Sequence, residues 1–82
     1  VSLAHDNVRE EMDRKDLEEA INRYLDGLPS KKRQIFVRRY FYLDEIYQIA
    51  EHFHMTESAV KVGLHRMRKS LKIHLQKEGY HI

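Results

Sequence analysis

The stretch from residue 44 to residue 75 constrains the fold of this 82-residue chain more than any other. Apolar side chains recur there every three or four residues, the spacing that places them on one face of an α-helix. The pattern breaks over residues 54–56 and then resumes, which predicts two helices joined by a tight turn. The two apolar faces would consist of Ile46, Ile49, Ala50 and Phe53, and of Val60, Leu64, Met67, Leu71 and Leu75.

Polar residues at the expected helix ends support this division. Asp44 precedes the first apolar face as an N-cap, and Glu45 follows in the first turn, where the helix dipole favours negative charge. Thr56 is placed to cap the second helix. We expect His54, in the turn, to need a positive φ, which a non-glycine residue adopts at a cost of about 1 kcal/mol.

The second helix of this pair is basic on its outer side. Residues 61–77 include six Lys or Arg residues and no acidic residue. A projection at about 100° per residue places the following side chains opposite the apolar face: Val62, His65, Arg66, Lys69 and Lys72. A helix–turn–helix with a basic, exposed second helix has the features needed for recognition of duplex DNA.

The charge is distributed unevenly along the chain. Residues 1–29 contain four Lys or Arg and eight acidic residues, whereas residues 30–82 contain eleven and five. This asymmetry favours a polyanionic partner for the second part only. The absence of cysteine and of any membrane-spanning or signal-peptide pattern is consistent with a cytoplasmic location. Since the chain opens on Val1, we expect it to be a piece of a longer protein.

Two further helices are expected before the helix–turn–helix. We interpret residues 1–15 as a linker or a frayed helix start, and residues 16–82 as the folded domain. The first helix would bury Leu17, Ala20, Ile21, Tyr24, Leu25 and Leu28. Pro29 ends it and opens the second helix, which Ser30 would help to cap. The second helix would turn Phe36, Val37, Tyr40 and Phe41 inward and leave Ile35 off that face.

The predicted class is therefore all-α, a small domain of four helices, without a wing. Gly79 would end the last helix. The basic run Lys31-Lys32-Arg33 opposes the helix dipole at the start of the second helix. Phosphate contact and a merely solvated surface explain this run equally well.

Other chemistries find little support in the sequence. The six histidines include no i, i+4 pair and have no cysteine partners, so we expect no metal site. No paired carboxylates, serine triad or glycine-rich phosphate loop is visible, so we expect neither catalysis nor a cofactor.

Five segments together resemble a known family. They are Ala20–Arg33, Ile35–Tyr40, Ile49–Glu51, Met55–Lys61 and Leu64–Leu71. A Leu-Pro-x-x-x-Arg start followed by this helix–turn–helix is similar to the C-terminal DNA-binding region, region 4, of bacterial sigma factors. The similarity covers about residues 17–78 and is greatest to the compact extracytoplasmic-function type. It implies docking on the flap of the RNA polymerase β subunit and recognition of the minus thirty-five promoter element.

The resemblance also implies roles for individual residues. Base contacts would fall on Lys61, Val62, His65 and Arg66, and phosphate contacts on Ser58, Arg68 and Lys69. The flap would contact some of Leu28, Ile35, Val37 and Tyr40, with Ile35 the first candidate because it lies off the inward face.

Three positions depart from the family pattern. His54 stands for a usual turn glycine, Ala59 for a common threonine, and Gly63 for a residue that is often polar or basic. Gly63 would allow close approach of a neighbour or of the DNA backbone. Val62 cannot donate a hydrogen bond, so at most it touches a thymine methyl group.

Two other classes of function stay open at this point. One is a helix–turn–helix regulator outside the sigma factors, which would need an activating ligand or a dimer interface. The other is a protein-interaction module, in which the basic helix contacts an acidic partner such as an anti-sigma factor.

Overall fold

A computed structural model of the chain describes residues 3–81, and its side chains from residue 13 onwards. The four helices are α1 (Leu3–Asp26), α2 (Ser30–Tyr40), α3 (Ile46–Phe53) and α4 (Glu57–Lys77). No strand occurs in the described part of the chain. The predicted class, all-α with four helices, is confirmed.

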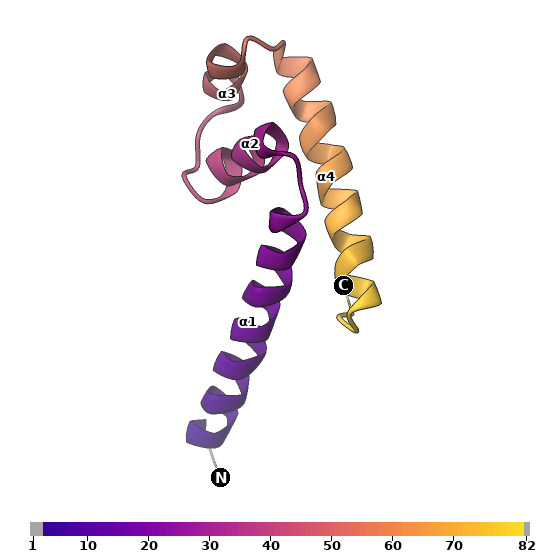
Figure 1. Ribbon diagram of the computed structural model, residues 1–82. Coiled ribbons are helices and arrows are strands. Elements are labelled where there is room, and N and C mark those ends of the chain that lie inside the picture. Colours follow the sequence, from indigo (N-terminus) through magenta and orange to yellow (C-terminus); the bar gives the residue numbers. More distant parts are fainter. Residues whose placement is uncertain (1–2, 82) are drawn as a thin grey trace.

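The two long helices, α1 and α4, form two limbs that are joined at one end by the short helices α2 and α3 (Figure 1). Tyr24 links α1 to α4, because its hydroxyl donates a hydrogen bond to the carbonyl of Met67 at 3.1 Å. The N-terminal part of α1 extends beyond the end of α4 (Figure 1). Because α1 begins at Leu3, the described residues before 16 are helical. The start of the folded domain at residue 16 stays a prediction.

The hydrophobic core lies where all four helices meet. Its largest fully buried side chains are Val60 and Leu64 of α4 and Ile49 of α3. The other buried members are Tyr24, Leu25, Ile35, Phe36, Ala50 and Met67. The inward stripes predicted for α1, α3 and α4 are therefore confirmed.

The face predicted for α2 is wrong at both ends. Ile35 is only 5% exposed, whereas Tyr40 is 37% exposed and Phe41 57% exposed. The reason is that α2 packs against both α3 and α4, so adjacent positions Ile35 and Phe36 are both buried. Phe41 comes after the last helical residue, so the helical projection does not apply to it.

Two predicted caps also differ. Glu45, not Asp44, is the N-cap of α3, and its N–H donates to the side-chain oxygen of Gln48 at 2.8 Å. Asp44 is instead bound to α2, because Arg38 donates to its carboxylate and Arg39 to its carbonyl. Ser30 makes no cap, since its hydroxyl accepts from the side chain of Gln34.

The turn between α3 and α4 has the predicted form. His54 is left-handed, with φ 56° and ψ 45°. Met55 donates its N–H back to the carbonyl of Ala50 at 2.8 Å, which closes the end of α3. The hydroxyl of Thr56 accepts from the N–H of Ala59 at 3.0 Å and caps α4.

The left-handed conformation of His54 gives a first prediction. Glycine adopts this conformation without the steric cost that a Cβ atom brings, so His54→Gly should leave the melting temperature unchanged or raise it slightly. Circular dichroism during heating measures this. His65→Gly, in the middle of α4, is the control and should destabilise the domain by about 0.4 kcal/mol, because glycine is a poorer helix former than histidine. A clear loss of stability in His54→Gly would contradict the prediction.

Candidate nucleic-acid interface

One side of α4 is exposed along its length. Val60, Leu64 and Met67 anchor the opposite side in the core. All seven predicted DNA contacts of this helix are exposed, namely Ser58, Lys61, Val62, His65, Arg66, Arg68 and Lys69. In a helical projection Val62 and Lys69 point directly away from the core, while Lys61 and Arg66 lie on opposite flanks. The predicted exposed face is confirmed, whereas its contacts with DNA stay a prediction.

The cations of this face are available to a partner. The described residues contain two arginine–carboxylate ion pairs, Arg23–Glu78 and Arg38–Asp44, and a close contact between the His74 ring and the Glu78 carboxylate. None of them involves Lys61, Arg66 or Lys69. Unpaired cations on one helix face are well suited to contact the phosphates of a nucleic acid.

Arg68 differs from the other cations of α4. Its guanidinium donates a hydrogen bond to the hydroxyl of Tyr40 at 2.6 Å. Arg68 thus links α4 to the end of α2, with its remaining N–H groups still available for phosphate.

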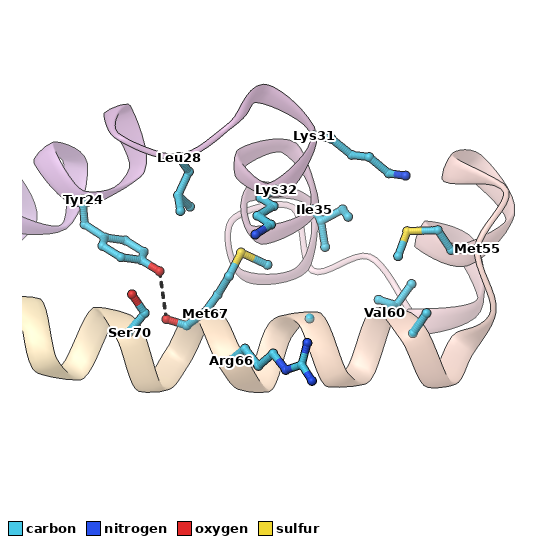
Figure 2. Close-up of a pocket in the computed structure, with 12 residues that line it drawn as sticks. Tyr24, Leu28, Lys31, Lys32, Ile35, Met55, Val60, Arg66, Met67 and Ser70 are labelled. Atoms are coloured by element: carbon cyan, nitrogen blue, oxygen red, sulfur yellow. Dashed lines mark hydrogen bonds between the residues drawn. The ribbon is translucent and has the colours of Figure 1, made fainter.

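A groove of about 430 Å³ lies between the end of α1, the start of α2 and α4. Leu28, Ile35, Val60 and Met67 contribute apolar side chains to it. Lys31 and Lys32 border it from α2, and Arg66 borders it from α4 (Figure 2). The groove therefore combines an apolar lining with a basic rim.

The basic run of α2 is divided by the geometry of the helix. Lys31 and Lys32 line the groove beside α4, whereas Arg33 lines a separate cleft with Val37 and Tyr42. Contact of all three with DNA phosphates stays a prediction, but they do not share one surface.

The residues expected to contact the polymerase flap are divided in the same way. Leu28 and Ile35 line the groove, and Ile35 belongs to its buried floor. Val37 lies in the cleft on the other side of α2, and Tyr40 lies beside Arg68. The structure therefore does not gather these residues in one cleft, and Ile35 is not the exposed residue that the sequence suggested.

Gly63 also borders the groove, and it gives a second prediction. A Cβ atom at Gly63 would meet no other atom within 4 Å, so no part of the chain approaches it closely. Gly63→Ala should raise the free energy of unfolding by about 1 kcal/mol, through helix propensity alone. Urea unfolding measures this. Gly79→Ala is the control and should destabilise, because Gly79 has φ 99°. A less stable Gly63→Ala variant would overturn the prediction.

No group of three potential metal ligands occurs among the described residues. No described helix has the length and apolar character needed to cross a bilayer.

Partial burial raises the pKa of the Tyr80 phenol above its ordinary 10.0, helped by the nearby carboxylates of Asp16 and Glu78 and opposed by Arg23. Tyr80 therefore stays neutral at physiological pH.

The family comparison agrees with this geometry. A family model described as "Sigma-70, region 4" matches residues 18–71, from the middle of α1 through most of α4. Comparisons with curated proteins and with solved structures returned no significant match. The match covers well over half of the chain and includes the whole helix–turn–helix. The chain therefore belongs to the sigma-70 region 4 family, the helix–turn–helix domains with which sigma factors bind promoter DNA.

Proposed function

We propose that this domain is the C-terminal part of an extracytoplasmic-function sigma factor and reads the minus thirty-five promoter element in the cytoplasm. The observation that carries the proposal is the basic, unpaired face of α4, held outward by the buried Val60, Leu64 and Met67. A helix presented in this way enters the major groove of duplex DNA, which is wide enough to admit it.

Contacts with DNA phosphates and contacts with base edges have separate tasks. Lys69 and Arg68, together with the hydroxyl of Ser58 in the first turn of α4, bind phosphates and set the position of the helix. Base edges are contacted by Lys61, His65 and Arg66, and Val62 meets a thymine methyl group. Affinity then depends strongly on salt, while sequence preference depends on few side chains.

The groove beside α4 is the proposed site for RNA polymerase. Its apolar lining, which includes Leu28 and Met67, suits a short apolar helix such as one on the β flap. Its rim of Lys31, Lys32 and Arg66 favours acidic side chains on the partner. The same charge pattern supports a second candidate, an acidic anti-sigma factor that competes for the groove.

Binding of duplex DNA at several salt concentrations tests the main proposal. Fluorescence anisotropy with promoter and random duplexes should show tighter binding to the promoter. The logarithm of affinity should fall with the logarithm of salt by about 0.9 for each phosphate contacted. The double variant Lys61→Glu, Lys69→Glu should lose binding to both duplexes. Lys15→Glu, on the exposed part of α1, should retain it.

Unchanged duplex affinity in the double variant would remove α4 as the DNA surface. Tight binding of an acidic protein together with no duplex binding at low salt would favour the protein-interaction alternative.

A further inference from the structure

The loop between α2 and α3, together with the first turn of α3, exposes large apolar side chains. Tyr42 is 71% exposed, Leu43 is 76% exposed, and Phe41 and Tyr47 are each 57% exposed. We call these four residues the aromatic ridge. The α2–α3 connection lies on the side of α2 and α3 that faces away from α4 (Figure 1). Duplex DNA bound to the outer face of α4 would therefore leave this connection, with Phe41, Tyr42 and Leu43, uncovered.

The ridge is held in place by hydrogen bonds. Tyr42 donates its N–H to the carbonyl of Val37 at 3.1 Å, and Asp44 donates to that of Arg38 at 2.8 Å. Arg39 returns a bond to the carbonyl of Asp44 at 3.0 Å. Leu43 has φ 60°, a strained conformation for a residue with a side chain. The backbone of a loop fixed in this way needs little further ordering on binding.

Two arginines lie next to one ring of the ridge, that of Tyr42. Arg33, Val37, Arg38 and Tyr42 line a cleft of about 340 Å³ on the outer side of α2. Arg33 forms no ion pair within the described part of the chain. Residues 27–43 contain no acidic residue. The cleft thus places the unpaired Arg33 beside the exposed ring of Tyr42. Its other arginine, Arg38, is paired with Asp44.

Arg38 is fixed beside this cleft. Its guanidinium contacts the Asp44 carboxylate at 3.4 Å and Nε2 of His52 at 3.2 Å, and lies 5.7 Å from the centroid of the Phe53 ring. Two acids lie between Leu43 and Tyr47: Asp44 is paired with Arg38, and Glu45 is the N-cap of α3.

We propose that the aromatic ridge and the adjoining cleft bind single-stranded nucleic acid. Exposed rings are platforms on which successive bases stack, and neighbouring arginines neutralise the phosphates between them. The positive charge of the cleft is complementary to the phosphates of such a strand. The ridge supplies rings for stacking but no set of hydrogen-bond donors that would read the base sequence. This surface is separate from α4, so the inference does not depend on duplex recognition.

Anisotropy of fluorescein-labelled dT12 and rU12 oligomers with the 82-residue chain tests the proposal at low salt. Tyr42→Ala should weaken binding at least fivefold, whereas Tyr42→Phe, which retains the ring, should stay within twofold of the original affinity. Arg33→Ala should weaken binding and lower the salt slope by about 0.7. Lys69→Ala is the matched control, because it should weaken duplex binding and leave oligomer affinity unchanged. Circular dichroism confirms that each variant is folded.

Three results would overturn the proposal. Equal oligomer affinity of Tyr42→Ala and the original chain would show that the ridge does not bind single strands. A loss of oligomer binding in Lys69→Ala as large as in Tyr42→Ala would place the strand on α4. If Tyr42→Ala weakens only the binding of RNA polymerase, the ridge is a protein surface and the proposal is wrong.

Discussion

Replacing Ile35 with aspartate is expected to unfold the domain and so to remove every binding activity together. Ile35 is 5% exposed and packs in the core that joins α2 to its neighbours. Loss of a buried isoleucine side chain alone costs about 2–5 kcal/mol. A buried carboxylate without a partner adds a further penalty. Since small domains are stabilised by only about 5–15 kcal/mol, most of the stability would be lost.

The sequence pattern suggests a different outcome, a folded Ile35→Asp variant that lacks only its contact with the polymerase flap. Circular dichroism at 222 nm and urea unfolding distinguish the two. Val37→Asp is the control, because Val37 is half-buried on the outer side of α2, where water reaches the new carboxylate. Val37→Asp should lower the free energy of unfolding by less than about 1.5 kcal/mol. Native helicity and stability in Ile35→Asp would contradict the packing described for α2.

Most of the fold follows from local features of the sequence. The apolar spacing of α3 and α4, the cap at Thr56 and the short turn at His54 each depend on neighbouring residues. Local steric rules and helix periodicity therefore predict them without knowledge of the tertiary structure. The exposed cationic face of α4 follows for the same reason, because residues 61–77 of this helix include six cations and no acid.

The predictions from sequence are wrong where tertiary contacts determine which residues are buried and which residue caps a helix. In α2, only the positions of α3 and α4 determine that Ile35 is buried beside Phe36. Asp44 matches the residue preference of an N-cap, but Arg38 and Arg39 of α2 bind it, and the helix begins one residue later. The groove could not be predicted either, because its walls come from α1, α2 and α4.

The aromatic ridge shows a further limit of periodicity. Tyr42 and Leu43 belong to no helix, so no amphipathic pattern indicates whether they are buried. Four consecutive large apolar residues, from Tyr40 to Leu43, would ordinarily be assigned to a core. Their exposure results from the hydrogen bonds that bring Asp44 back to α2.

Removal of the Arg66 side chain is expected to have the largest effect on promoter recognition. Its guanidinium matches guanine bidentately, so Arg66→Ala should cost about 1–3 kcal/mol on the promoter and relax preference at one base pair. Arg66 lies on the flank of α4 that borders the groove. From this flank its side chain can reach base edges when the outer face of α4 lies in the major groove. Anisotropy with promoter duplexes altered at single positions, measured at low salt, identifies that base pair.

Lys69→Ala serves as the matched comparison, because Lys69 lies one turn farther along α4 and points directly away from the core. Its loss should weaken promoter and random duplexes alike and reduce the salt slope by about one unit. Identical behaviour of the two variants on both duplexes would refute the division between base reading and positioning. If Arg66→Ala keeps promoter preference but loses an acidic protein partner, Arg66 belongs to the groove. If neither variant changes duplex affinity, the basic face of α4 is not a DNA surface.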